Sequence, residues 1–111
     1  MENSKIVTAL AALAQEHRLK TFRLLVQAGD SGVPAGKIAE QVGIAPSSLS
    51  FHLKELSYAG MVASRQEGRS VIYTANYALM NQVIEFLTEN CCQGVPCSPE
   101  LSKCCTEKEV E

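Results

Sequence analysis

Hydrophobic side chains recur every three to four residues along most of the chain, which is the spacing of helices with one apolar face. The first such stretch covers 3–13 and places Ile6, Leu10 and Leu13 in one row. The second covers 16–28 and stops at a Gly-Asp-Ser-Gly turn. Its inward positions are predicted to be Leu19, Phe22, Leu25 and Val26.

Two shorter helices follow, separated by a tight turn. The first covers 35–41 and is closed by Gly43, because glycine readily ends a helix. The second begins at Pro46, since proline is favoured at the first helical position, and runs to about Ala59. Two helices joined by a short turn that contains glycine form a helix-turn-helix unit. The inward positions of the first of these helices are Ile38, Ala39 and Val42.

A β-hairpin is predicted directly after the helix-turn-helix. Residues 62–66 and 70–74 read as two short strands, and Gly68 supplies the backbone freedom that the turn between them needs. A last helix covers 77–90. We therefore expect a mainly α fold with a small β-hairpin, a winged helix-turn-helix. The apolar side of the last helix consists of Met80, Val83, Ile84 and Leu87.

The cysteines are confined to the end of the chain. The sequence has 111 residues, enough for one domain, and its first 90 contain no cysteine. An odd number crowded into so short a segment argues against a disulfide framework, which would close long loops along the chain. We therefore divide the chain into a winged-helix domain, residues 1–90, and a cysteine-rich tail, residues 91–111. The five cysteines are Cys91, Cys92, Cys97, Cys104 and Cys105.

Composition and charge exclude several classes of protein. No apolar run approaches the ~18 residues of a membrane span, and the net charge of −2 gives no global signal for nucleic acid. The apolar stretch 6–14 could imitate a secretory signal, but Glu2 and Thr8 weaken that interpretation. No glycine-rich phosphate loop or nucleophile–base pair indicates an enzyme. We expect a cytoplasmic protein with no membrane partner, in a reducing compartment that suits free thiols.

The helix that begins at Pro46 has the pattern of a helix that reads DNA. At about 100° per residue, Leu49, Leu53 and Leu56 form a stripe that we expect to be buried. The opposite face has short polar residues near its start, where base edges are reached, and a lysine for phosphates. The candidate DNA-binding residues on and beside this face are Ser47, Ser48, Ser50, Phe51, His52 and Lys54.

Phe51 is unexpected on a face that meets only solvent. We hypothesise that it contacts a thymine methyl group in the major groove; the alternative is that it folds sideways onto the core. His52 could donate to a phosphate, or be satisfied within the protein. Arg65 and Arg69 flank the hairpin tip and could reach phosphates or the minor groove, or remain solvated. Because residues 37–72 have only four Lys or Arg against three Glu, a dimer on a palindrome is favoured.

These motifs together resemble the ArsR/SmtB family of repressors. Residues 10–19, LAALAQEHRL, are similar to the opening of that family, and 47–56, SSLSFHLKEL, to its recognition region. Residues 60–62 and 65–73, GMV and RQEGRSVIY, look like its wing. The resemblance covers about residues 5–90. It implies a homodimer, joined through the first and last helices, that represses from operator DNA and leaves it when a metal or metalloid binds.

The resemblance leaves the tail as the place for the inducer. Many arsenic sensors of this family have a Cys-Val-Cys cluster near the helix-turn-helix, whereas residues 33–58 contain no cysteine. Zinc sensors of the family use Asp and His on the last helix, and residues 77–90 contain neither. The tail resembles the Cys-Cys…Cys site of a subset of arsenite-responsive members. The ligands that this favours are Cys91, Cys92 and Cys97, with Cys104 and Cys105 as alternatives or a second site.

The chemistry of three thiols fits that resemblance. Trivalent arsenic prefers three sulfur ligands, so we expect As(III) as the inducer, with Sb(III) as a second candidate. A zinc site would want four ligands, commonly in paired C-x₂₋₄-C units. A thiol redox switch would form disulfides instead. A redox-sensing repressor and a zinc- or cadmium-responsive repressor of the same fold remain the alternatives.

Overall fold

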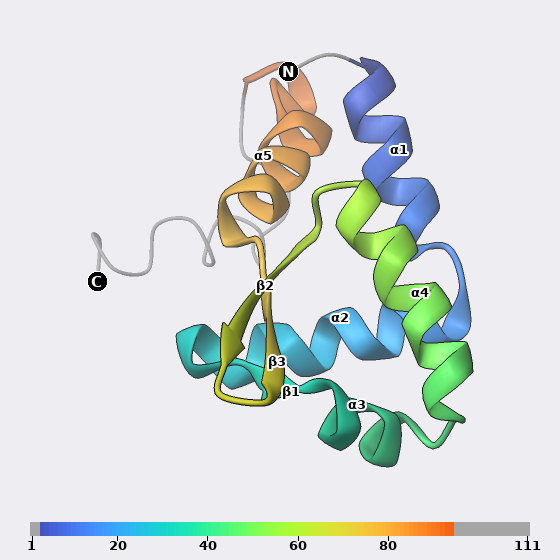
Figure 1. The fold of residues 1–111 in the computed structure, drawn as a ribbon. Coiled ribbons are helices and arrows are strands. Elements are labelled where there is room, and N and C mark those ends of the chain that lie inside the picture. The colour runs from blue at the N-terminus through green and yellow to red at the C-terminus, as the bar shows by residue number, and fades with distance from the viewer. Residues whose placement is uncertain (1–2, 95–111) are drawn as a thin grey trace.

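The computed structural model describes residues 3–94 and arranges them as a winged helix-turn-helix, as the sequence predicts (Figure 1). The start of α4, α3 and the hairpin tip lie at one end of the molecule, and α5 lies at the other end, where α1 begins. In chain order the elements are α1 (Asn3–Leu13), α2 (Glu16–Ala28), the 3₁₀ turn η1 (Gly29–Ser31), β1 (Val33–Pro34), α3 (Ala35–Val42), α4 (Pro46–Tyr58), β2 (Val62–Glu67), β3 (Ser70–Ala75), α5 (Tyr77–Thr88) and the turn η2 (Cys91–Gly94).

The hairpin is part of a three-stranded antiparallel sheet in the order β1-β3-β2. The sequence did not predict β1, because it is only two residues long and directly precedes α3. Val33 pairs with Tyr73 and Pro34 with Ile72. Gly32, just before β1, has φ of +72°, and a Cβ there would lie 2.7 Å from the carbonyl oxygen of Tyr73. Only glycine fits this approach without strain.

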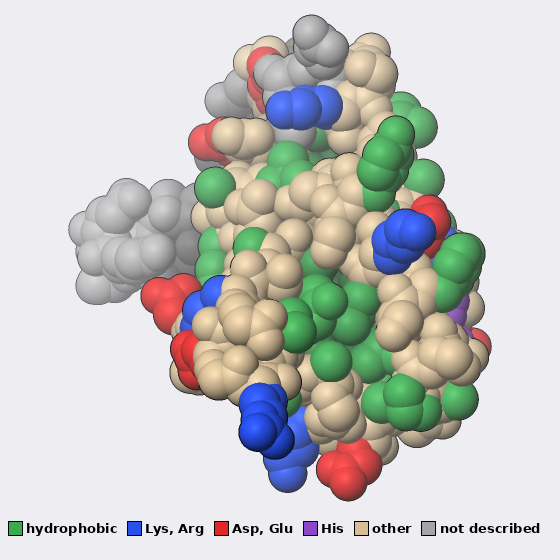
Figure 2. All heavy atoms as spheres, viewed as in Figure 1, with side chains coloured by type: hydrophobic (Ala, Val, Ile, Leu, Met, Phe, Trp, Pro, Cys, Tyr) green, Lys and Arg blue, Asp and Glu red, His purple; other side chains and the backbone are tan. Residues whose placement is uncertain are grey.

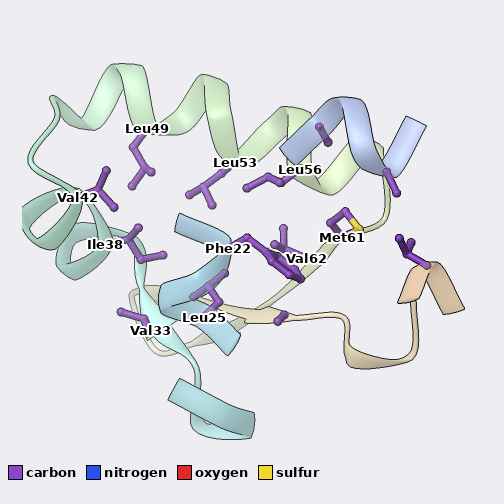
Figure 3. Close-up of a cluster of buried hydrophobic side chains, with 14 of the residues drawn as sticks. Phe22, Leu25, Val33, Ile38, Val42, Leu49, Leu53, Leu56, Met61 and Val62 are labelled. Carbon is purple, nitrogen blue, oxygen red and sulfur yellow. The ribbon is translucent and has the colours of Figure 1, made fainter. Parts of the chain in front are cut away.

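The core lies between α4, α2 and α3, as Figure 3 shows. The predicted stripe of α4 is confirmed, since Leu49, Leu53 and Leu56 are all buried. These side chains point toward Phe22 and Leu25 of α2. The predicted inward face of α3 is also confirmed and consists of Ile38, Ala39 and Val42.

Two leucines that we expected inside lie outside. In α1 the buried residues are Ile6, Ala9 and Ala12, and Leu10 is exposed. The small alanines face the rest of the domain and let α1 pack closely on α2 and α4. Leu19 is also exposed. The buried face of α2 is centred on Leu25, and Leu19 lies about 120° from it around the helix.

The last helix is shorter and less buried than predicted. α5 ends at Thr88 rather than Asn90, and only Val83 of its predicted apolar side is buried. Its first residue, Tyr77, anchors it by donating from the phenol to the carbonyl oxygens of Leu25 and Val26. No helix within residues 3–94 combines the length and the apolar character needed to cross a bilayer.

Candidate functional site

The face of α4 opposite the leucine stripe is exposed to solvent. Ala45 before it has an extended backbone and Pro46 occupies the first turn, so the helix begins without a side-chain cap. The amide groups of an uncapped first turn point outward and can meet an anion such as a phosphate. The exposed residues of this outer face are Ser47, Ser48, Ser50, Phe51, Lys54 and Tyr58.

Phe51 points away from the core. Its side chain is 57% exposed, so the alternative in which it folds sideways onto the core is wrong. Its ring meets His52 edge-on, with 5.6 Å between the centroids. Tyr58, two turns further along the same face, is 88% exposed. The outer face of α4 thus presents two unburied aromatic rings around Lys54.

His52 is partnered within the protein. Its Nδ1 lies 3.3 Å from Nη1 of Arg18, and its ring centroid is 5.7 Å from that of His17. Partial burial lowers the pKa of His52, the charges of Arg18 and His17 lower it further, and Glu55 opposes them. Sequence reasoning identified His52 but not Arg18, which is 34 residues away and has no periodic relation to it.

The two hairpin arginines differ in their surroundings. Arg65 Nε lies 2.6 Å from Oε2 of Glu67, and its other nitrogens donate to the carbonyl oxygens of Asp30 and Ser31 at 3.2 Å and 2.9 Å. Arg65 therefore fastens β2 to η1. Arg69, in the turn, is exposed. We predicted the same role for both arginines, but Arg65 makes structural hydrogen bonds and Arg69 is an exposed cation.

Charge on this side of the molecule is mixed. Figure 2 shows Lys and Arg side chains beside α4 and near the hairpin tip, each with acidic side chains close by. This agrees with the small positive excess of residues 37–72. A surface with so small an excess of positive charge can contact few phosphates. Two copies of it would double those contacts.

The thiol segment begins where α5 has ended, as the sequence predicts. Asn90, Cys92 and Gln93 have left-handed backbones, with φ of 57°, 53° and 60°. The turn brings the two neighbouring sulfurs together: the thiol of Cys91 donates to Sγ of Cys92 at 3.6 Å. Cys92 is also disulfide-bonded. Within residues 3–94 no group of three or more His, Cys, Asp or Glu could hold a metal ion. The predicted positions Cys97, Cys104 and Cys105 lie outside the described residues.

Comparisons with known proteins decide the family. A model of the family described as "Helix-turn-helix domain" matches residues 13–65. The transcriptional regulator NmtR of Mycobacterium tuberculosis is 31% identical over 71 residues, which cover 64% of this chain and 57% of NmtR. The structure of HlyU from Vibrio cholerae is 32% identical with a TM-score of 0.66, and the match covers 83% of this chain and 99% of HlyU. The chain belongs to the ArsR family of winged-helix transcriptional regulators.

Two further structures are informative about this ArsR-family chain. Mb0332 of Mycobacterium bovis is described as a homodimeric winged helix-turn-helix DNA-binding domain, and as a possible ArsR-family regulator. It is 28% identical with a TM-score of 0.61, over 77% of this chain and 83% of its own. A second structure of HlyU is described as reduced, with 31% identity and a TM-score of 0.64, over 80% and 90% of the two chains.

Proposed function

We propose that this ArsR-family chain is a dimeric repressor that binds operator DNA through α4 and releases it when thiolates after α5 bind As(III). The observation that carries the DNA-binding part is the outer face of α4, which is exposed from Ser47 to Tyr58 while its leucine stripe is buried. Short hydroxyl side chains at the start of the helix suit contacts to base edges, and Lys54 suits a phosphate.

Phe51 is the proposed sequence-reading residue of this face. Its exposed ring can pack against the C5-methyl group of thymine, which distinguishes that base in the major groove. Binding of wild type and Phe51→Ala should be compared on a selected duplex and on the same duplex with uracil in place of thymine. We expect the wild type to lose affinity on the uracil duplex and the variant to lose much less. Equal losses would contradict the contact.

Dimerisation would use the apolar faces that the single chain leaves open on α1 and α5. Val7 and Leu10 are 62% and 38% exposed, and Ile84 and Leu87 are 50% and 60% exposed. Mb0332, described as homodimeric, supports the same assembly for this chain. Sedimentation of Ile84→Glu/Leu87→Glu should give monomers that bind DNA weakly. Matched substitution of Gln82 and Glu85, exposed polar residues of the same helix, should leave the dimer intact.

The proposed inducer site is the thiol segment. Two thiolates that bind one soft ion at about 2.3 Å each, the length of a zinc–sulfur bond, can lie no more than about 4.6 Å apart. The 3.6 Å between the sulfurs of Cys91 and Cys92 is compatible with a shared ion once Cys92 is reduced. Cys97 is the proposed third ligand, and Cys104 and Cys105 stay as alternatives. Ligand binding would reshape the turn that directly follows Thr88 and so change α5 at the dimer interface.

One release titration tests this function. A fluorescein-labelled duplex, selected from a random-sequence library by the wild-type protein, is bound under a reductant that does not compete for the metalloid. As(III), Sb(III), Zn(II), Cd(II) and peroxide are then added separately while anisotropy is followed. A coupling of ~1–3 kcal/mol would weaken binding by ~5–150-fold. We expect As(III) to release the duplex, with Sb(III) as the second candidate, and Zn(II) and Cd(II) to have little effect.

Cysteine variants make that titration specific. The triple variant Cys91→Ser/Cys92→Ser/Cys97→Ser should still bind the duplex but should no longer respond to As(III). The matched double variant Cys104→Ser/Cys105→Ser should respond as the wild type does. Release from the triple variant at wild-type concentrations of As(III) would overturn the assignment.

A redox-sensing repressor is the second candidate, and one observation favours it. Cys92 is disulfide-bonded, so the segment can be oxidised without any metalloid. The related HlyU has been solved in a form described as reduced. For this candidate, release would follow peroxide and be reversed by reductant, and As(III) would act only by blocking the thiols from oxidation.

A further inference from the structure

The imidazole of His52 lies where three helices meet. Nη1 of Arg18 is 3.3 Å from Nδ1 of His52, and Nε of the same arginine donates to the carbonyl oxygen of Ala12 at 2.6 Å. Ala12 is in the last turn of α1, Arg18 in the first turn of α2, and His52 in the middle of α4. One guanidinium therefore connects the end of α1 to the helix proposed to read DNA.

This connection requires a neutral imidazole. Arginine stays charged and only donates, so Nδ1 of His52 must offer a lone pair and the imidazole proton must be on Nε2. A protonated His52 would lose that lone pair and become a second cation beside Arg18. The other charged or titratable groups that act on it are His17 of α2 and Glu55 of α4 itself. From α1, the carbonyl oxygen of Ala12 accepts from Arg18.

We propose that Arg18 is a positioning residue that fixes α4 relative to α1 through neutral His52, so that protonation of His52 weakens operator binding. The inference rests on the proposed function, in which a dimer binds operator DNA through α4. Two recognition helices must fit half-sites about 34–36 Å apart. With α1 in the dimer interface, a shift of α4 against α1 changes that spacing in both protomers.

The direction of the pH effect follows from the surroundings of His52. Partial burial, Arg18 and His17 together hold the pKa of His52 below its ordinary value of 6.5. The neutral imidazole that the contact needs therefore predominates at neutral pH, and the contact is lost as the pH falls through a pKa that lies below 6.5. If protonated His52 instead bound a phosphate, the pH dependence would be reversed, because DNA would then bind more tightly in acid.

The experiment is a pH profile of duplex binding between about pH 8 and pH 5. The probe is a labelled duplex selected at pH 8 by the wild-type protein, at constant ionic strength. We expect the wild type to bind at least about fivefold more weakly at the acid end. His52→Asn keeps an oxygen near the position of Nδ1 that accepts from Arg18 but does not titrate, so its affinity, compared with its own value at pH 8, should show a flat profile.

Two further variants separate positioning from simple folding. Arg18→Gln removes the cation and should bind about fivefold more weakly at pH 8, with little further loss in acid. His17→Asn is the matched control beside the same ring, and it should keep the profile with its midpoint moved upward. Circular dichroism and sedimentation at each pH show whether every variant is folded and dimeric where affinities are compared.

The outcomes are distinguishable. A wild-type affinity that is constant or rises in acid overturns the inference, and so does a pH dependence that survives in His52→Asn. Wild-type protein that binds no selected duplex at pH 8 overturns the proposed function and this inference with it. A flat profile on a duplex that is bound overturns the inference alone.

Discussion

Replacing Gly32 by alanine should damage the connection between the helix-turn-helix and the sheet. The added Cβ would lie 2.6 Å from Cγ2 of Ile72, 2.7 Å from the carbonyl oxygen of Tyr73 and 2.9 Å from Cγ2 of Thr74. All three atoms belong to β3, the central strand. The backbone oxygen cannot retreat freely, because Tyr73 pairs with Val33 directly after the glycine.

Two free-energy costs add in this variant. A left-handed backbone costs an L-residue about 1–2 kcal/mol, and Gly32 has φ of +72°. Forcing extra atoms into packed structure costs about 1–3 kcal/mol. Gly32→Ala should therefore lower the free energy of unfolding by about 2–5 kcal/mol, a large part of the about 5–15 kcal/mol of an ordinary domain.

The assay is urea unfolding followed by circular dichroism, at one fixed protein concentration so that the proposed dimerisation contributes equally. Gly36→Ala is the matched control, because Gly36 is inside α3 and a Cβ there meets nothing within 4 Å. This control should be neutral or stabilising by up to about 1 kcal/mol. A Gly32→Ala protein within about 0.5 kcal/mol of wild type, the spread of ordinary surface substitutions, would refute the reasoning. So would an equal loss in both variants.

The other predictions concern stability. Thr21 is fully buried, and its hydroxyl has no hydrogen-bond partner among residues 3–94, so Thr21→Val should raise the free energy of unfolding by about 1 kcal/mol in the same urea assay. Arg65→Ala should lower it by about 1 kcal/mol by removing the bonds to η1, whereas Glu67→Gln should cost less than about 0.5 kcal/mol because its ion pair is exposed. Because the folded protein holds the pKa of His52 down, the unfolded chain takes up that proton first, so stability should fall as the pH drops below about 6.5. Unfolding of His52→Asn at pH 7.5 and 5.5 checks this, since the variant should lose less stability than wild type.

The helix-turn-helix could be predicted from sequence because its signals are local. Leucines at helical spacing and Pro46 at the helix start specify α4, and the structure buries that stripe as expected. The outward position of Phe51 followed from the same spacing. Leu10 and Leu19 were misplaced because spacing alone does not show which side of a helix meets its neighbours.

The remaining contacts join residues that are far apart in the chain. The bonds from Arg65 to η1 span 34 and 35 residues, and the contact of Arg18 with His52 spans 34. No periodic pattern links such pairs, so Arg65 was predicted as a cation for DNA or a solvated side chain, and not as a contact to η1. The left-handed backbone of Cys92 is likewise a local conformation that composition does not specify.

The metal-ligand set of the tail remains a proposal from the sequence, because Cys97, Cys104 and Cys105 lie outside the described residues.

The two edges of the sheet limit the addition of β-strands from other molecules. β1 is only two residues long and ends in Pro34, which has no backbone N–H to donate to a neighbouring strand. The opposite edge, β2, has an arginine and a glutamate in its exposed part. Short edges with proline or charge resist the addition of strands from other chains, which is a common route to aggregation. The wing can therefore project into solvent near a partner molecule without recruiting β-strands, and the exposed apolar side chains of α1 and α5 remain as the surface proposed for self-association.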